Sequence, residues 1–324
     1  IIPIGITKDG QWKKFNGEIE LIEGGKWKEL ISAEDEDIFS IISNKDKAVL
    51  SNQDFGDTID VIFPVLHGPM GEDGTVQGMF ETLDIPYVGA GVLSSALCMD
   101  KGFAKTIFES ENLNVAKCSL LLKHKVNNNL DKYIEEVELL GYPLFIKPAN
   151  LGSSVGITKA HNREQLIKGL EEAFSYDRRV LVEEFINGRE LECAVLGNDG
   201  PKASVVGEIL PSHEFYDYES KYFDDGKSKL IIPANISKEI SDKIREMAVD
   251  AYIAVDCSGL ARVDFFLEKE TNNIYINEIN TMPGFTRYSM YPLLWKETGL
   301  PYDKLIDELI KLAIERHNNK NSLI

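Results

Sequence analysis

The sequence predicts an α/β protein of more than one domain, and three observations lead to this prediction. Its 324 residues, 43% of them hydrophobic, exceed the ~100 to 150 residues of a typical single domain. Near the start, short apolar runs such as IIPIGI and DVIFPVLHG alternate with stretches of helical character, as in a parallel α/β unit. Apolar and polar residues also alternate at 260–268 and 274–280, on either side of the turn-prone EKETNN, which predicts an antiparallel hairpin.

The composition excludes several classes of partner. A formal net charge of −18 argues against nucleic acid, because phosphate neutralisation needs clustered Lys and Arg. No run approaches the ~18 to 20 apolar residues of a membrane span. The four cysteines are scattered without CxxC spacing, which favours reduced thiols over a disulfide framework or a zinc site. We therefore expect a soluble, cytoplasmic protein with no nucleic-acid or membrane partner.

The first candidate site is HGPMGEDG, residues 67–74. It follows an apolar run, and ligands of parallel sheets bind beyond the carboxyl ends of strands. Its glycines let the backbone approach a ligand closely, while His67, Glu72 and Asp73 supply polar groups. An ordinary surface loop accounts for the same residues equally well. Because the chain starts inside an apolar run, we expect further sequence upstream of residue 1.

A second module starts near residue 94 with an amphipathic helix that runs to Ser110. Ser94 or Ser95 is its predicted N-cap. Lys101 and Lys105 share one face of this helix at i, i+4 spacing, and by themselves they read as solvated lysines.

FIKPANLGSSVG, residues 145–156, is the second candidate site. Lys147 leaves a predicted strand, and a loop with Gly152, Ser153 and Ser154 follows, dense in N–H and hydroxyl donors. Such a loop beside a lysine can hold phosphates. Neither GxxxxGK[ST] nor GxGxxG is present, and a structural turn is an equal alternative.

Residues 178–197 read as two strands joined in a hairpin at an Asn-Gly turn. Glu183, Glu184 and Glu190 lie around that turn. A strand that ends one module and opens the next can line a cleft suited to adenine, although exposed strand glutamates are the simpler interpretation.

Residues 211–235 lack periodicity and carry five aromatic side chains, which favours an ordered lid over disorder. A helix with Ser237 as its N-cap is predicted to follow, and two more amphipathic helices close the chain.

The polar face of the 260–280 hairpin is the third candidate site. Because strand side chains alternate between faces, Arg262 and Asp264 share one face, and Glu278 and Asn280 repeat the pattern. Carboxylate and amide oxygens are the ligands that Mg²⁺ prefers. A charged solvent face is the alternative.

Several motifs, taken together and in order over residues 1–316, resemble the ATP-grasp ligases and in particular the D-alanine:D-alanine ligase family. They are LHGPMGEDG, VGAGVLSSALCMDK, FIKPANLGSSVG, LVEEFINGRE, EFYDYESKY, ARVDFF and NEINTMPGFT. The resemblance implies a three-domain ATP-grasp fold with ATP between the sheets of the central and C-terminal domains. The implied domains are an N-terminal parallel α/β domain at 1–93 whose first strand and helix lie upstream, a central domain at 94–184, and a C-terminal domain at 185–324 with the lid at 211–235.

The resemblance also implies the residues that bind the nucleotide and metal. ATP is expected at Lys101, Lys147, Ser154 and Lys221, with Glu183 and the backbone of Ile186 at adenine and Glu190 at ribose. Two Mg²⁺ ions, with Mn²⁺ as an alternative, are expected at Asp264, Glu278 and Asn280.

The implied reaction joins two D-alanine molecules for peptidoglycan synthesis. A carboxylate attacks the γ-phosphate of ATP, and a second amine displaces the acylphosphate. Arg262 and the N–H of Gly284 would stabilise the oxyanion, Ser289 would hold the second D-alanine, and His67 would lie near the first. Lys221 and Tyr222 would shut the lid, with Tyr222 bonding to Ser153.

The family has a glutamate for the ammonium of the first D-alanine, and we expect it upstream of residue 1. The resemblance further implies a homodimer. Two alternatives remain: a D-alanine:D-lactate ligase, which Tyr222 within ESKY disfavours, and a non-catalytic ATP-binding protein.

Overall fold

The computed structural model describes residues 1–7, 10–15, 17, 22, 59–152, 155–210 and 229–322. The chain divides into two compact units, residues 1–60 with 83–85, and residues 61–82 with 86–324. In the first unit, β1 (Ile4–Ile6) pairs antiparallel with β2 (Trp12–Lys14). The predicted strand at IIPIGI is therefore present, and its described partner is an antiparallel neighbour.

The second unit opens with the parallel pairing that the sequence predicts. Ile62 and Tyr87 form a parallel bridge, and α3 (Thr75–Thr82) lies between them in the chain. The loop at residues 67–74 follows the first of these extended segments, as expected.

The helix predicted to run to Ser110 is instead two helices, α4 (Val92–Met99) and α5 (Lys101–Ser110). Asp100 separates them, because its extended backbone interrupts the helical conformation. Its carboxylate caps α5 by accepting hydrogen bonds from the N–H groups of Gly102 and Phe103. The predicted cap was wrong: Ser94 and Ser95 are buried within α4, which starts after Gly91.

A four-stranded antiparallel sheet follows, in the order β3-β6-β4-β5. Its strands are β3 (Cys118–Leu122), β4 (Leu144–Pro148), β5 (Thr158–Ala160) and β6 (Arg179–Glu184), with α6 (Lys123–Asn128), α7 (Leu130–Glu138) and α8 (Arg163–Tyr176). Leu144, Ile146, Val180 and Val182 join the helices in one apolar core. Because strand side chains alternate, Lys147 and Glu183 point to the opposite face.

The C-terminal sheet has five antiparallel strands in the order β11-β10-β7-β8-β9. They are β7 (Gly188–Gly197), β8 (Lys202–Leu210), β9 (Lys229–Ile231), β10 (Gly259–Glu268) and β11 (Ile274–Asn280). The predicted β10–β11 hairpin is confirmed. Most of the predicted lid, residues 211–228, lies outside the described residues, but its last part contributes β9.

The predicted hairpin at residues 178–197 was wrong. β6 pairs with β3 and β4, whereas β7 pairs with β8 and β10 in the other sheet. The Asn-Gly dipeptide carries the chain between sheets rather than turning it back. A Cβ on Gly188 would lie 2.9 Å from the carbonyl oxygen of Leu267, so glycine is required by the close approach of β10.

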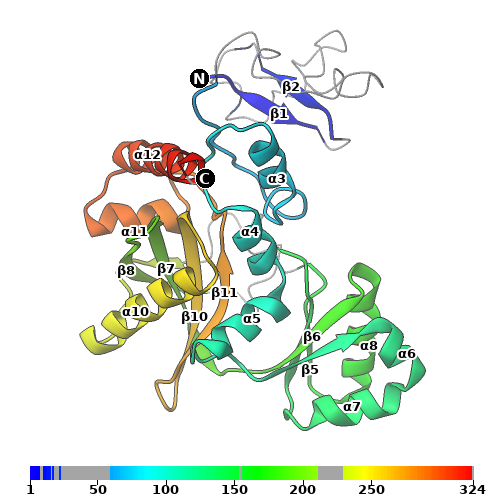
Figure 1. Cartoon of the computed structure of the whole chain (residues 1–324). Coiled ribbons are helices and arrows are strands. Elements are labelled where there is room, and N and C mark those ends of the chain that lie inside the picture. The colour runs from blue at the N-terminus through cyan, green and yellow to red at the C-terminus, as the bar shows by residue number, and fades with distance from the viewer. Residues whose placement is uncertain are drawn as a thin grey trace, which may run out of the picture. The chain divides into compact units, whose positions relative to one another are not determined.

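Helices cover both faces of the five-stranded sheet (Figure 1). On one face lies α10 (Lys238–Ala254), whose first turn is capped by Ser237 as predicted. On the other lie α11 (Met290–Thr298) and α12 (Tyr302–Asn321). Ala104 and Phe108 of α5 join the core on the α10 side, although α5 falls within the predicted central domain. The boundaries at residues 93 and 184 stay a prediction.

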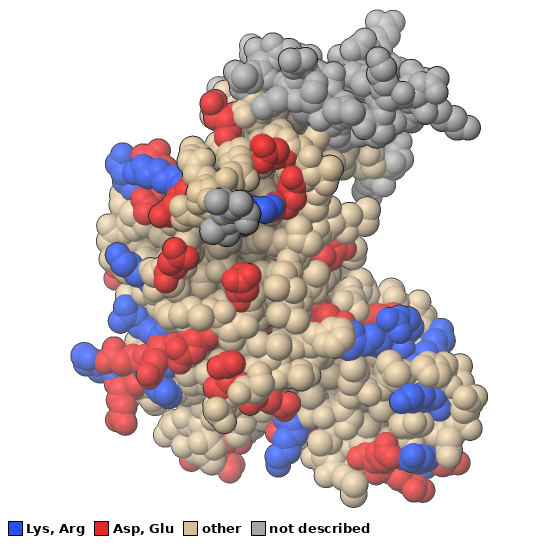
Figure 2. All heavy atoms as spheres, in the orientation of Figure 1, with Lys and Arg blue, Asp and Glu red and all other residues tan. Residues whose placement is uncertain are grey.

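The described surface is acidic but mixed. Figure 2 shows Asp and Glu spread over the drawn face, with Lys and Arg interspersed among them. Among the described helices, none is long and apolar enough to cross a membrane.

Candidate active site

The polar face of the β10–β11 hairpin is built as predicted. Arg262 pairs with Asn280 and Asp264 with Glu278 in the register of the two strands. The Nε and Nη2 atoms of Arg262 each lie 2.7 Å from an oxygen of Asp264, which makes a bidentate contact. Glu192 on β7 adds a carboxylate oxygen 3.2 Å from Nε. The prediction of a shared face is confirmed.

The polar residues lie on the same face of the five-stranded sheet as an apolar core, further along the strands. Ala194, Leu196 and Leu260 belong to the core under α11 and α12. Glu192 lies two residues before Ala194, and Arg262 two residues after Leu260, so the period of two places both on the same face beyond that core. The helices thus cover the apolar end of the sheet and leave its polar end for a ligand.

Electrostatics keep Arg262 charged. Burial disfavours the guanidinium, but Asp264 and Glu192 outweigh it and raise the pKa of Arg262 well above its usual value. A fixed positive charge therefore sits among three carboxylates, with Glu278 as the third contributor.

The donor set fits a hard cation in part. Asp264 and Glu278 face each other across the strands, and Oδ1 of Asn280 also accepts the N–H of Met282 at 3.0 Å. In the described ranges, no group of three or more His, Cys, Asp or Glu side chains could hold a metal alone. Two carboxylates and an amide suit an ion such as Mg²⁺, which fills its remaining positions with phosphate oxygens and water.

A cluster of lysines lies on the four-stranded side. The Nζ atom of Lys147 is 2.6 Å from Oε2 of Glu183, and Nζ of Lys105 is 3.1 Å from Oε1 of the same carboxylate. Burial alone would raise the pKa of Glu183, but the two lysines lower it to about 2. Glu183, expected at adenine, thus has both carboxylate oxygens in ion pairs.

Lys147 also reaches the other sheet. Its Nζ atom lies 3.4 Å from Oδ1 of Asn277. The β10–β11 register shifts between Asp264 and Phe265, which leaves Asn277 as the extra residue of a bulge. Burial lowers the pKa of Lys147, and Glu183, Glu278 and Glu190 more than reverse the effect. Glu190, expected at ribose, is therefore within electrostatic reach of Lys147.

Lys101 is the point where the two sides meet. Its Nζ atom donates to the carbonyl oxygen of Leu151 at 2.6 Å and lies 3.9 Å from Oε2 of Glu278. Its backbone N–H bonds to Ala149, at the end of β4. Lys101 thus contacts both Leu151, just before the loop with Ser153 and Ser154, and Glu278, a predicted metal ligand.

The other predicted nucleotide contacts are partly described. Ile186, which is buried, lies in the segment between β6 and β7. Ser153, Ser154, Lys221 and Tyr222 lie outside the described residues.

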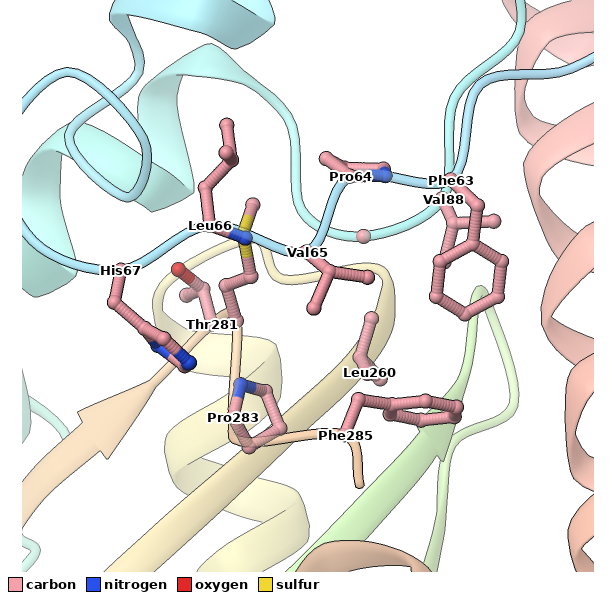
Figure 3. A pocket seen from close by; sticks show the side chains of 12 residues that line it. Phe63, Pro64, Val65, Leu66, His67, Val88, Leu260, Thr281, Pro283 and Phe285 are labelled. Carbon is pink, nitrogen blue, oxygen red and sulfur yellow. The ribbon is translucent and has the colours of Figure 1, made fainter. Parts of the chain in front are cut away.

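His67 lies at one end of a small pocket, with Phe63 and Phe285 at the other end (Figure 3). The N–H of Leu66 donates to the sulfur of Met282 at 3.3 Å and fixes this segment beside the end of β11. Burial, and then the charge of Arg262, lower the pKa of His67, so a neutral imidazole faces this region at pH 7.

Glu72 belongs to the loop at residues 67–74, for which the sequence did not decide between a ligand site and an ordinary surface loop. Its carboxylate accepts the N–H of Gly68, and Oε2 lies 3.7 Å from where a Cβ on Gly152 would be. Burial raises the pKa of Glu72 to about 7, with a further contribution from Glu278 and opposition from the Gly68 N–H, Lys101 and Arg262. This carboxyl group therefore lies among the charges of the site.

Gly284 and Ser289 lie together at the N-terminus of α11. A Cβ on Gly284 would be 3.1 Å from Oγ of Ser289. That hydroxyl accepts the N–H of Thr286 at 3.0 Å. A helix N-terminus with a nearby hydroxyl and backbone N–H favours a carboxylate, and the role expected for Ser289 stays a prediction.

Two further residues of the site escaped sequence reasoning. Lys105 reads as solvated but is buried, and the signal was its i, i+4 spacing from Lys101. Glu192 alternates with Glu190 in ELEC, so the period of two could have placed both on one face of β7; in the register Glu192 lies opposite Asp264, diagonal to Arg262.

Two antiparallel sheets, one bringing buried lysines and the other a carboxylate face to a common site, define an ATP-grasp ligase. Family models agree: one described as "D-ala D-ala ligase N-terminus" matches residues 1–90, and one described as "D-ala D-ala ligase C-terminus" matches residues 107–311. The chain belongs to the D-alanine–D-alanine ligase family.

Individual relatives support this assignment. The chain is 51% identical to a D-alanine–D-alanine ligase of Thermoanaerobacter sp. (strain X514), over 99% of this chain and 89% of that protein. It is 52% identical to D-alanine–D-alanine ligase B of Clostridium tetani, over 99% and 85%.

Solved structures are similar too. The D-alanine-D-alanine ligase of Coxiella burnetii matches with a TM-score of 0.80 and 34% identity, over 99% of this chain and 86% of that one. The VanG D-Ala:D-Ser ligase of Enterococcus faecalis matches with a TM-score of 0.81 and 41% identity, over 97% and 89%. An ATP complex of the Bacillus anthracis D-alanine–D-alanine ligase matches with a TM-score of 0.69 and 30% identity, over 83% and 84%.

Proposed function

We propose that this chain, an ATP-dependent ligase, joins two D-alanine molecules through an acylphosphate. The observation that carries the proposal is the contact between Lys101 and Glu278, 3.9 Å apart. It brings a predicted phosphate-binding lysine beside a predicted metal-binding carboxylate. ATP with its bound cations needs both, because its phosphates are anionic and phosphoryl transfer depends on neutralising their charge.

Each side of the site would hold a different part of the nucleotide. Lys101 and Lys147 would bind its phosphates, and Ile186 and Glu190 would meet its adenine and ribose. Asp264, Glu278 and Asn280 would hold two Mg²⁺ ions, or Mn²⁺, which neutralise phosphate charge and align the reacting groups. Glu183, if it also meets adenine, has to share its carboxylate with the lysines.

Arg262 and the N–H of Gly284 would stabilise the oxyanion of the second step. Losing one such donor costs about 3 to 4 kcal/mol in well-studied hydrolases. Ser289, beside Gly284 at the start of α11, would hold the carboxylate of the second D-alanine. Neutral His67 would lie near the first, where an uncharged ring can donate one hydrogen bond and accept another.

The lid would complete the site. Lys221 and Tyr222 would close over the nucleotide, with Tyr222 bonding to Ser153 and Ser154 contacting phosphate. Closure would exclude water that hydrolyses an acylphosphate. The support for these four residues is the ESKY and LGSSVG motifs of the sequence.

Phosphate release from ATP and Mg²⁺, with and without D-alanine, tests the proposal. We expect release that depends strictly on D-alanine, with the dipeptide as product. Release without any amino acid, or none under either condition, would contradict it, and the latter would favour a non-catalytic ATP-binding protein.

The acceptor needs a separate test, because one similar structure is a D-Ala:D-Ser ligase. Rates with D-alanine, D-serine and D-lactate should be compared at neutral pH. We expect D-alanine to be preferred, and a preference for D-lactate would indicate the depsipeptide alternative.

We also propose a cytoplasmic homodimer that supplies peptidoglycan synthesis. The proposed reaction consumes ATP, a cytoplasmic metabolite, which supports the location. Light scattering at several protein concentrations tests the dimer, and a monomer throughout would contradict it.

A further inference from the structure

Lys105 has no place in the reaction described so far, yet it is among the most buried charged residues of the site. Only 3% of its side chain is exposed, against 4% for Glu183 and 10% for Lys147. We propose that Lys105 is a positioning residue for ATP: it holds one oxygen of Glu183, so that Lys147 keeps a net positive charge for a phosphate. This inference rests on the proposed function.

The charge balance of the three residues carries the argument. Two ammonium groups share one carboxylate, at 2.6 Å and 3.1 Å, so the buried cluster keeps an excess positive charge. A buried charge without compensation is costly, and an anion that binds beside it offsets that cost. If Lys105 were neutral, Glu183 would fully compensate Lys147, and a phosphate would have to compete with that carboxylate.

Lys105 and Glu183 depend on each other. Among the described residues, neither Nζ of Lys105 nor Oε1 of Glu183 has a hydrogen-bond partner, so their ion pair at 3.1 Å is the contact that compensates both. Oε2 of Glu183 is taken by Lys147. Lys105 therefore determines how the carboxylate divides between the two lysines.

The position of Lys105 is fixed by the rest of α5. Asp100, at its start, forms a buried ion pair with Arg179 at the start of β6. The N–H of Lys101 bonds to Ala149 after β4. Phe108, one turn further along α5, anchors the helix in the core of the five-stranded sheet, and Figure 1 shows α5 beside β11. Lys105 is thus presented to Glu183 by a helix that is held on both sides.

A simpler role is possible, in which Lys105 only fastens α5 to β6. The two roles differ in what a neutral substitution does to ATP binding. If Lys105 only holds α5 against β6, its loss should lower the stability of the protein and weaken the binding of all substrates together. A positioning residue affects ATP alone, and its loss is offset by also neutralising Glu183.

The test measures ATP affinity directly by calorimetric titration with Mg²⁺, together with KM for ATP and for D-alanine. For Lys105→Met we expect the Kd and KM for ATP to rise roughly 10- to 100-fold, the scale of one hydrogen bond to a charged group. KM for D-alanine should change less than about 2-fold, well under the tenfold effect of one lost charged contact. Lys105→Arg should restore most of the ATP affinity because it keeps the charge.

The double variant Lys105→Met with Glu183→Gln separates the two roles. It removes both charges and takes away the carboxylate paired with Lys147, so it should bind inorganic tripolyphosphate more tightly than Lys105→Met alone. Tripolyphosphate is the probe because it lacks the adenine that Glu183 is expected to contact.

Lys123→Met is the matched control. Lys123 is an exposed lysine at the start of α6 whose Nζ atom donates to the carbonyl oxygen of Phe174 at 2.8 Å, and it is not among the residues proposed to bind ATP. It should lower the melting temperature and leave ATP affinity unchanged.

Three results would overturn the inference: unchanged ATP affinity in folded Lys105→Met, parallel increases of both KM values, or a double variant that binds no better than the single one. If the wild-type chain binds ATP but releases no phosphate with D-alanine, the proposed function fails while the binding tests still decide the role of Lys105.

Discussion

The two halves of the site handle charge in opposite ways. On the four-stranded side, one carboxylate, Glu183, is shared by two lysines. On the five-stranded side, one guanidinium, Arg262, lies among carboxylates that include Asp264 and Glu192. The first cluster has an excess of positive charge and the second an excess of negative charge.

This difference explains how one ligand can use both. An excess of positive charge attracts phosphate, and an excess of negative charge attracts metal ions, so the metal-bound nucleotide proposed above would satisfy both clusters together. Lys101 and Glu278 mark where they meet. The following predictions alter the two sides or the link between them.

The largest effect is expected for Glu278→Gln. It removes a charge of the proposed metal site from the negative side, and metal ions supply several kcal/mol of transition-state stabilisation, so turnover should fall roughly 1000-fold. D-alanine-dependent phosphate release at increasing Mg²⁺ measures this. Glu297→Gln, an exposed glutamate on α11, is the control. Near-normal turnover of the first variant would remove Glu278 from the metal site.

Arg262→Lys should lower kcat about 100-fold. Lysine keeps the charge but cannot reproduce the bidentate contact with Asp264, and so the donor would be misplaced for the oxyanion of the proposed reaction. Steady-state kinetics should show a loss in kcat larger than any change in KM for ATP. A loss confined to the KM for ATP would assign Arg262 to nucleotide binding instead.

Gly188→Ala tests the link between the two sheets. The added Cβ would meet the carbonyl oxygen of Leu267 at 2.9 Å, and because backbone must move, unfolding should become easier by about 1 to 3 kcal/mol. Urea denaturation measures the change. Gly200→Ala, which meets nothing within 4 Å, should have little effect, and equal stability of the two variants would argue against the close approach.

The smallest effect concerns pH. The pKa of Glu72 is about 7 in the folded protein, raised first by burial, against 4.5 for the unfolded group. Its contribution to stability is complete below pH 4.5 and is lost as pH rises through 7. Glu72→Gln cannot ionise, so without ligands its melting temperature should rise relative to wild type between pH 5 and 8.

Asp73→Asn is the control for this pH dependence. Burial raises the pKa of Asp73, but backbone N–H groups of Met70 and Thr75 lower it below 3.8 overall. Its contribution is therefore constant between pH 5 and 8, and so should be the difference from wild type. A flat difference for Glu72→Gln as well would contradict the raised pKa.

Local sequence patterns gave correct predictions where the feature depends on a single helix or strand. Alternation placed Arg262 and Asp264 on one face of β10, and Ser237 marked the start of α10. The hairpin predicted from Asn187 and Gly188 was wrong, because an Asn-Gly dipeptide can close a hairpin or connect strands of two different sheets. Which of these occurs depends on strands that are distant in the sequence.

The sequence by itself determined the positions of β10, β11 and α10 and the polar face of the β10–β11 hairpin. Through its motifs it also determined the family. Only the tertiary structure decided that Lys105 is buried against Glu183, that Glu183 is shared with Lys147, and that Lys101 reaches Glu278. The physical reason is that the face a side chain occupies follows from its own helix or strand. Its charged partner, in contrast, is set by packing between segments far apart in the chain.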